Sequence, residues 1–502
     1  MLWTLTGALA APLTYDDALD EALQANTDLL GAQADVKAAE GSLLSTRGAY
    51  DPQLGASLYT SANTSEDSLA RFGFPGAVSL QDTDVNGWSM NLSQSFWTGT
   101  SWNVGWDSTY ATNAYGFYTT EGEPLSTGDD NEQLTKYFSN GLSLSLTQQL
   151  LDGVRLASNL STVRASKRAV TSAQAAQLQS RQDVLSGAAA AYWDLYAAWR
   201  AEATADRSVE VATEEKRIVE AQVSAGNMAP IEATRVEAAL AQARLDLITS
   251  RQAADAASDA LAVVLGRDPA ERITPETGPG EVPQGLDITV DDAVGVALDS
   301  SPALQLAQLS VEGADDDLLV ARHQRLPSLS ITGSLGFNGY REYDILVEQA
   351  TDPNFDVGWS EGAAASREKL FSLDYRNNYV GLELSTPLGF RVERGAVMSA
   401  GAGLEKARRD LEAAERAVAQ QVAAQVRTIE NAYQTVELAE LNLRLAEETL
   451  AAEKARQEVG RAIQKDVLEA IRARDEAEAG LVSALVEFRK ALVALKALQG
   501  KL

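Results

Sequence analysis

The sequence predicts an α+β fold in which one structural unit, made of long coiled-coil helices and amphipathic strands, occurs twice. Three observations predict it: an internal repeat, an alternation of apolar and polar residues in each copy, and helical stretches of unusual length. In the repeat, residues 13–29 (LTYDDALDEALQANTDL) return as residues 288–304 (ITVDDAVGVALDSSPAL). The offset of 275 residues (288 − 13) continues without a gap for about forty residues, and a repeat this long means two copies of one unit.

The composition excludes several classes of function. Acidic residues outnumber basic ones by 71 to 42, and the net charge of −29 argues against nucleic-acid binding, which needs a basic face. The chain has no cysteine and therefore no disulfide, thiolate nucleophile or cysteine metal site. Its single histidine, His323, stands between two arginines ahead of Pro327, and we expect it at a helix end. No catalytic set, phosphate-binding loop, metal site or cofactor is predicted, so we expect a protein that is not an enzyme.

The chain divides into four predicted segments. Residues 1–12 resemble the apolar part of a signal peptide but lack a positively charged start, so a signal-peptide remnant and an ordinary N-terminus both stay open. Residues 13–265 form the first repeat and residues 287–502 the second. Between them, residues 266–286 contain four prolines and are predicted to be a linker. The sequence contains no run of 18 apolar residues, so no transmembrane helix is expected.

Each repeat is predicted to begin with a helix and to continue into strands. Residues 14–50 have a helical pattern with Thr14 or Asp16 as the cap, and Pro52 lies just beyond the helix end. Alternation predicts strands at 54–60, in both arms of a hairpin over 87–112, and at 141–150, 329–337 and 380–384. The polar stretches 62–86 and 112–138 are predicted to be loops.

Long helices follow the strands in each repeat. They are predicted at about 155–223, from 232 to about 265, at 392–458 and at 463–499. The first would be on the order of 100 Å long. Apolar residues such as Leu481, Leu485 and Phe488 have heptad spacing, which is typical of a coiled coil and also of an ordinary antiparallel helical hairpin. If Tyr192 matches Tyr433, the two repeats differ by one heptad between this tyrosine and the following turn.

These features together resemble the TolC-like outer membrane efflux protein (OEP) family. The resemblance covers nearly the whole chain and rests on the order, duplication and spacing of motifs that are weak singly. They are the doubled opening, the helix-to-strand junctions Arg47…Pro52-Gln-Leu54 and Arg322…Pro327-Ser-Leu329, the strand ends at 146–150 and 384–388, and the turns at Gly226 and Gly460.

The resemblance implies a homotrimeric channel in the outer membrane of a Gram-negative bacterium. The strands would form a transmembrane β-barrel in outer-membrane lipid, and the helices an α-helical barrel in the periplasm. The implied function is a passive conduit for tripartite efflux or type I secretion, with a periplasmic adaptor and an inner-membrane pump or ABC exporter as partners. The strand pattern fits, because a tilted strand of about 9–11 residues with one apolar and one polar face can cross a membrane.

The first repeat departs from the family plan of two strands per repeat. If the hairpin over 87–112 spans the membrane, a trimer has 18 strands, and if it lies above the membrane at the extracellular mouth, a trimer has 12. The tryptophan and tyrosine residues of the hairpin fit an interfacial girdle and a buried hairpin equally well, so both alternatives stay open.

The turns between the long helices carry the predicted functional residues. The resemblance implies that Glu232, Asp466 and Glu469 narrow the periplasmic entrance as rings of carboxylates that favour cations. Acids in the first turn of a helix are also favourable without any pore. The resemblance further implies that an adaptor docks on the small residues of the helix tips, which are Ala225, Gly226, Val459 and Gly460.

A second hypothesis belongs to another class of protein. The chain could be a non-channel coiled-coil structural protein of the cell envelope. The alternating strands argue against it, because a spacer needs no amphipathic barrel.

Overall fold

The computed structural model describes residues 12–125, 132–151, 156–269, 271–280, 285–349, 351–459 and 464–502. The predicted signal-peptide remnant, except for its last residue, and the tip residue Gly460 lie outside these residues. The chain forms two compact units. Unit 1 comprises Met1–Gly41, Arg168–Gly313 and Leu404–Leu502, and unit 2 comprises Ser42–Lys167 and Ala314–Gly403.

Helices and strands follow one another in two similar series. The α-helices are α1 (Tyr15–Ala25), α2 (Thr27–Gly48), α3 (Leu156–Asn159), α4 (Ser161–Ser224), α5 (Pro230–Val264), α6 (Val290–Ser300), α7 (Pro302–Gln324), α8 (Ile345–Gln349), α9 (Trp359–Phe371), α10 (Arg391–Glu458) and α11 (Gln464–Leu498). The strands are β1 (Gln53–Ser68), β2 (Ala77–Ser95), β3 (Thr100–Thr119), β4 (Glu132–Gln149), β5 (Ser328–Asp344) and β6 (Arg376–Ser385), and a short 3-10 helix, η1 (Leu69–Phe72), follows β1. None of the described helices is both long and apolar enough to cross a membrane.

The helix predicted over 14–50 is in fact two helices, α1 and α2, which meet at Asn26. The side-chain oxygen of Asn26 accepts hydrogen bonds from the backbone N–H groups of Asp28 (2.9 Å) and Leu29 (3.3 Å). An asparagine in this position caps the first turn of the second helix, so the break is encoded locally. The second repeat breaks between α6 and α7 at Ser301, which precedes Pro302.

The two repeats use the same caps in unit 1. The hydroxyl of Thr14 accepts a hydrogen bond from the N–H of Asp17, and that of Thr289 accepts one from the N–H of Asp292, both at 3.2 Å. A glycine with positive φ follows each of the two shorter hairpin helices, Gly266 after α5 and Gly500 after α11. Positive φ favours glycine because other residues meet their own Cβ there.

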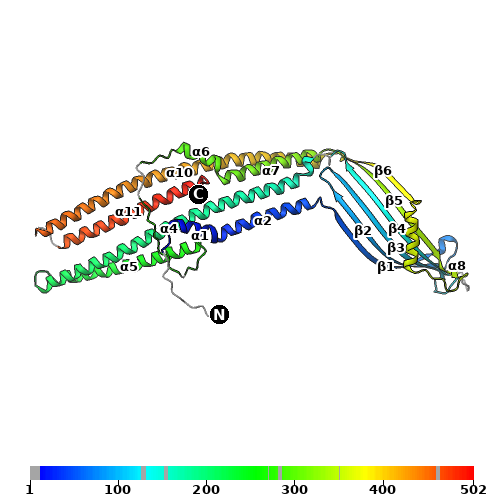
Figure 1. The fold of residues 1–502 in the computed structure, drawn as a ribbon, viewed down its shortest axis with the longest axis horizontal. Helices are drawn as coiled ribbons and strands as arrows, with labels where there is room; N and C mark the ends of the chain where they lie inside the picture. The colour runs from blue at the N-terminus through cyan, green and yellow to red at the C-terminus, as the bar shows by residue number, and fades with distance from the viewer. Residues whose placement is uncertain are drawn as a thin grey trace. The chain divides into compact units, whose positions relative to one another are not determined.

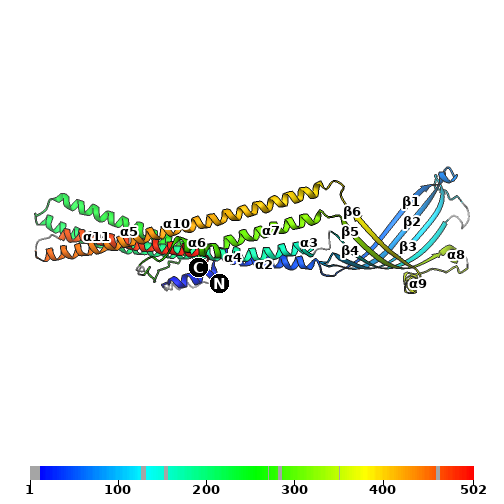
Figure 2. The ribbon, with the colours of Figure 1, turned by 90° about the horizontal axis from the view of Figure 1, so that it is seen from above.

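The helical hairpins α4–α5 and α10–α11 have equal spacing. The helix ends Ser224 and Glu458, the starts Pro230 and Gln464, and the ends Val264 and Leu498 are each 234 residues apart (458 − 224, 464 − 230 and 498 − 264). Figures 1 and 2 show the ends of α4 and α10 and the starts of α5 and α11 on the same side of these hairpins. The return helices α5 and α11 have 35 residues each.

This spacing corrects the predicted one-heptad difference. With an offset of 234, Tyr192 matches Val426, not Tyr433, and Leu195 matches Ile429. All four matched side chains are buried. Tyr433 lies seven residues, one heptad, closer to its turn than Val426 does. It therefore lies on the same side of the helix as Val426, which is why the sequence pattern matched it to Tyr192. The two hairpins therefore have the same length from these residues to their tips.

The core of unit 1 contains two apolar clusters, one for each repeat. Tyr192 lies in the first cluster with α1 and α5, and Val426 lies in the second with α6 and α11. The predicted linker belongs partly to this core, because Ile273 is buried and its N–H donates to the hydroxyl of Ser258 at 2.8 Å. Its residues near 275 also pair with Leu13 through backbone hydrogen bonds.

In unit 2 the six strands form one antiparallel sheet in the order β1-β2-β3-β4-β5-β6 (Figure 1). The predicted loops 62–86 and 112–138 are wrong over most of their length, because β1 to β4 extend far into them. These stretches are rich in Ser, Thr, Asn and Asp, which are usual in turns, but the strands need no apolar residue on their polar face. The predicted hairpin over 87–112 corresponds to the parts of β2 and β3 that lie next to the turn between them.

We predict that Tyr192→Phe destabilises unit 1 by about 1–3 kcal/mol, because the phenol makes hydrogen bonds to the backbone of both Leu13 and Thr277, each worth about 0.5–1.5 kcal/mol. Its hydroxyl donates to the carbonyl of Leu13 (3.1 Å) and accepts from the N–H of Thr277 (2.9 Å). Thermal unfolding followed by circular dichroism measures the loss. The matched control is Tyr433→Phe, which removes one longer bond, to the N–H of Gly285 (3.2 Å), and should cost less.

The same variant should change the dependence of stability on pH. Burial raises the pKa of Tyr192 above its ordinary value of 10.0. The native state therefore holds this proton more tightly, and its contribution to stability is complete below about pH 10 and is lost as the pH rises through the raised pKa. Tyr192→Phe should lose less stability in this alkaline range than the parent, and an equal loss would contradict the assignment.

Candidate channel surfaces

One face of the sheet carries an apolar belt across all six strands. The register places Leu54 opposite Leu92, Val104 opposite Leu144 and Leu335 on the same face. The belt consists of Leu54, Ala56, Leu58, Trp88, Met90, Leu92, Trp102, Val104, Trp106, Leu142, Leu144, Leu146, Leu329, Ile331, Gly333, Leu335, Phe337, Val380, Leu382 and Leu384. The residues of the belt are uncharged, and Arg376, opposite Phe337 on the same face, borders the belt on β6. Side chains such as Leu58 (84% exposed) and Val380 (77% exposed) need a cover that is not water.

The opposite face carries small and polar side chains at the same level. Within the belt's level these are Gly55, Ser57, Ser89, Asn91, Ser93, Asn103, Gly105, Ser143, Ser145, Thr147, Ser330, Thr332, Ser334, Gly336, Tyr379, Gly381 and Glu383. Hydroxyl groups on neighbouring strands bond across it, as between Ser57 and Ser89 (2.7 Å) and between Thr147 and Thr332 (3.1 Å). A wall with one apolar and one polar face suits a barrel with lipid outside and water inside.

Beyond the belt, away from the helix junctions, α9 covers the apolar side of β4 and β5. Phe138 is buried against Ala363 and Val357, and the hydroxyl of Ser366 accepts from Asn140 (2.7 Å) and donates to the carbonyl of Gly339 (3.0 Å). This cover was not predicted from the sequence. It ends the exposed apolar belt on β4 and β5 at the level of Asn140.

Of the predicted tip residues, Ala225, Gly226 and Val459 directly follow the ends of α4 and α10. Gly226 has a φ of +78° and follows the end of α4, while Ala225 and Val459 are exposed. Nothing lies within 4 Å of the position of a Cβ on Gly226, so its conformation, not crowding, requires glycine.

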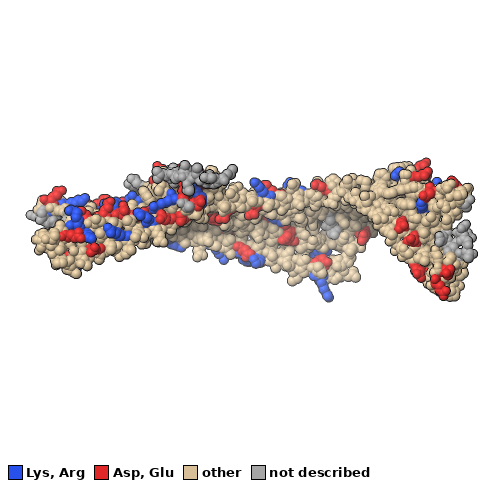
Figure 3. Space-filling view, turned by 90° about the horizontal axis from the view of Figure 1, so that it is seen from below, with Lys and Arg blue, Asp and Glu red and all other residues tan. Residues whose placement is uncertain are grey.

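Glu232 and Asp466 lie in the first turns of the return helices, and Glu469 lies one turn deeper in α11. Glu232 pairs with Arg235 at 3.0 Å and Glu469 pairs with Lys465 at 3.5 Å. With the offset of 234, Glu232 matches Asp466 and Arg235 matches Glu469. The two hairpins therefore present the same charge in the first turn and opposite charges one turn deeper. Figure 3 shows charges of both signs crowding the surface of this end of the helices.

A charged cluster joins α4 to α11 below the tips. The carboxylate of Glu478 pairs with Arg200, with Arg207 at 3.4 Å and with Arg474 at 3.1 Å. Nearer the tips, Arg472 of α11 pairs with the largely buried carboxylate of Glu215 of α4 at 2.5 Å. These residues were missed from the sequence, because the pairs between α4 and α11 leave no spacing pattern in either helix, and only Arg474–Glu478 lies within one helix.

The sequence pattern of one family accounts for most of this chain. The family described as "Outer membrane efflux protein" matches residues 99–267 and 293–501. The two ranges hold 169 and 209 of the 502 residues, about three quarters of the chain. The chain belongs to the outer membrane efflux protein family. It is an outer-membrane protein of a Gram-negative bacterium that extends into the periplasm, and its family consists of efflux channels.

Solved structures of channel proteins share the fold at low identity. VceC of Vibrio cholerae is 17% identical, with a TM-score of 0.63 over 97% of this chain and 96% of that one. CmeC of Campylobacter jejuni is 16% identical, with a TM-score of 0.65 over 97% and 85%. The open state of MtrE of Neisseria gonorrhoeae is 18% identical, with a TM-score of 0.61 over 97% and 88%. Among proteins of curated function, none matches the sequence.

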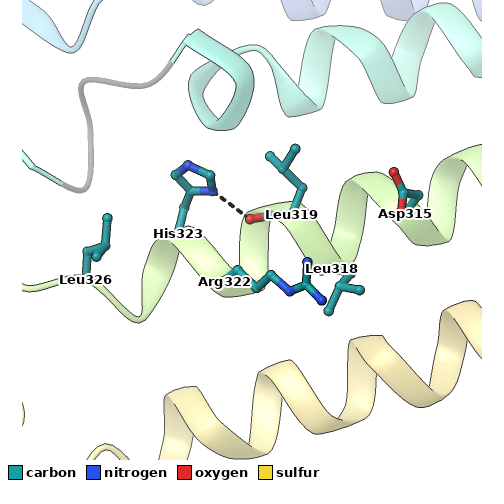
Figure 4. A pocket seen from close by; sticks show the side chains of 6 residues that line it. All are labelled: Asp315, Leu318, Leu319, Arg322, His323 and Leu326. Carbon is teal, nitrogen blue, oxygen red and sulfur yellow. Dashed lines mark hydrogen bonds between the residues drawn. The ribbon is translucent and has the colours of Figure 1, made fainter.

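The only histidine of this family member lies in the last turn of α7, as expected for a helix end. His323 is half-buried, and its Nδ1 donates to the carbonyl of Leu319 at 2.8 Å, because a carbonyl can only accept (Figure 4). The hollow beside it is lined by Asp315, Leu318, Leu319, Arg322, His323 and Leu326. None of these lining residues is a hydroxyl or thiol nucleophile, and Asp315 lies eight residues away along the helix.

We predict that Glu478→Gln lowers the stability of the α4–α11 contact by about 1–3 kcal/mol, because three guanidinium groups lose a shared charged acceptor. The midpoint of thermal unfolding in detergent measures this loss. Glu476→Gln is the matched control: this acid is exposed on the same helix, and its change should stay within about 0.5 kcal/mol. Equal shifts for the two variants would contradict a role for the cluster.

Proposed function

We propose that the chain is a passive exit duct that works as a homotrimer in tripartite efflux or type I secretion. The observation that carries the proposal is the two-faced sheet, with its uncharged apolar belt on one side and small polar residues on the other. Such a wall separates lipid from water, and the helical hairpins joined to it supply a path through the periplasm. A structural spacer of the envelope, the alternative hypothesis, has no use for such a belt.

The partners would meet the duct at the hairpin tips. An adaptor with helical hairpins of its own needs close approach, which Ala225, Gly226, Val459 and Gly460 would allow because they have small side chains or none. An inner-membrane pump or ABC exporter would supply the energy. The cargo would pass through water and would meet few specific groups.

Planar bilayers test the duct directly. The purified protein should need detergent, migrate as a heat-modifiable trimer and give discrete single-channel conductance. A water-soluble rod without conductance would overturn the proposal.

We propose that Asp466 and Glu469 line the entrance together with Glu232. Replacing Asp466→Asn with Glu469→Gln should lower the ratio of cation to anion permeability severalfold and weaken block by trivalent cations, because rings of carboxylates concentrate cations. Reversal potentials in a salt gradient measure this ratio.

Arg235→Gln is the matched control, since Arg235 occupies the position in α5 that Glu469 occupies in α11. Removing a positive charge at the same level should raise the preference for cations. If neither variant moves the reversal potential, these residues lie away from the pore.

Docking at the tips predicts a defect in transport without a defect in the channel. Val459→Glu places a charge on an exposed side chain (69% exposed) and should cost little stability. Export in cells should fall to the level of a strain without the channel, while conductance in bilayers stays unchanged. Val459→Thr, of similar size and shape, should keep export. Normal export by the glutamate variant would show that this tip is not a contact.

A further inference from the structure

The hairpin β2–β3 runs the full height of the sheet. Its turn lies at the helix junctions: the side chain of Asn159 in α3 donates to the carbonyl of Trp97 (2.8 Å), and Gln94 donates to that of Tyr50 (3.0 Å). The N–H of Gln149, at the end of β4, donates to the carbonyl of Gly99 (3.0 Å). The turn of the hairpin therefore lies at the end of the sheet at which β1 begins and β4 ends.

The belt continues through the hairpin without interruption. Met90 of β2 lies opposite Ala56 of β1 and Trp106 of β3, and Trp106 lies opposite Leu142 of β4. On the other face, Ser89, Asn91 and Asn103 continue the small polar residues. A hairpin placed above a membrane in water would have no reason to keep the apolar residues of its neighbours at the same level.

Both edges of the sheet are exposed, and each carries part of the apolar belt, Leu54 to Leu58 on β1 and Val380 to Leu384 on β6. All 16 residues of β1 are exposed, as are nine of the ten in β6. Neither edge strand contains a lysine or proline, residues that usually block pairing at an edge. In a membrane the unpaired N–H and C=O groups of such an edge must find partners. With six strands, β1 and β6 run in opposite directions, so β1 of one copy can pair antiparallel with β6 of another.

We propose that three copies close into an 18-stranded barrel (three times six strands), in which β2 and β3 are part of the membrane wall and β1 pairs with β6 of the next copy. The inference rests on the proposed trimeric duct. Matching the belt across the new edge places Leu54 against Leu384, Ala56 against Leu382 and Leu58 against Val380.

The added hairpin sets the width of the exit. Barrel diameter grows about linearly with strand number, so 18 strands give a wall about 1.5 times as wide as 12 strands. Barrels of about 16–18 strands leave an open aqueous channel. The outer-membrane section would then admit large hydrated cargo and would not be the narrowest part of the duct.

Single cysteines test the position of the hairpin, and the chain has no native cysteine to interfere. Met90→Cys and Val104→Cys should resist a membrane-impermeant thiol reagent and be quenched by lipid-attached quenchers. Their neighbours Asn91→Cys and Asn103→Cys should react with the reagent and lower the conductance. Reaction of all four without lipid quenching would place the hairpin outside the membrane and overturn the proposal.

A cross-link tests the closing edge. Ala56→Cys combined in turn with Val380→Cys, Leu382→Cys or Leu384→Cys should give, for one of the three, covalently linked trimers on oxidation. Ala56→Cys with Leu335→Cys, which lies one strand inward on β5, should not. If none of the three pairs links, β1 and β6 do not close the barrel. If the parent protein itself gives no conductance, the proposed duct fails, whereas a conducting parent with the opposite cysteine results refutes the 18 strands alone.

Discussion

Backbone hydrogen bonding inside a membrane is the constraint on which the rest of this structure depends. A strand that crosses lipid must give every N–H and C=O group a partner, and only a closed sheet does so. The continuous register from β1 to β6 meets this requirement for the four inner strands. It also fixes the faces, because a slip of one residue would move the whole apolar belt to the polar side. The alternation along each strand and the pairing between strands therefore specify one another.

The helices meet a different constraint, which is that the two helical hairpins have equal length. In the proposed duct, two hairpins that end together would need the same length, and the matched ends of α4, α5, α10 and α11 satisfy this. The two cores hold the hairpins at the same height with different residues. Tyr192 bridges Leu13 and Thr277 through its hydroxyl, while Val426 fills the equivalent place with a smaller apolar side chain. Equal geometry is thus kept while the chemistry of the two copies diverges.

The repeat, the long helices and the alternating strands could be predicted from sequence because each leaves a local period. The break at Asn26 was missed, although its capping side chain is a local signal. The long strands through 62–86 and 112–138 were missed for a physical reason. Polar residues occur on both faces of the sheet in these stretches, so no apolar period marks them. The pairing of Tyr192 with Tyr433 failed because a shift of seven residues preserves the heptad phase. The Glu478 cluster and α9 depend on contacts between distant segments, which no local pattern encodes.

The positions at which the repeats disagree are informative once the offset of 234 is fixed. Acids occupy the first turn in both return helices, which the helix dipole alone explains. One turn deeper the dipole weakens, and there the first repeat has Arg235 where the second has Glu469. In a trimer, three copies of Arg235 and three of Glu469 would alternate around the pore at one height. The electrostatic field at that height would depend on which hairpin lies closer to the pore axis. The difference between the copies, more than the acids they share, therefore carries information about the entrance.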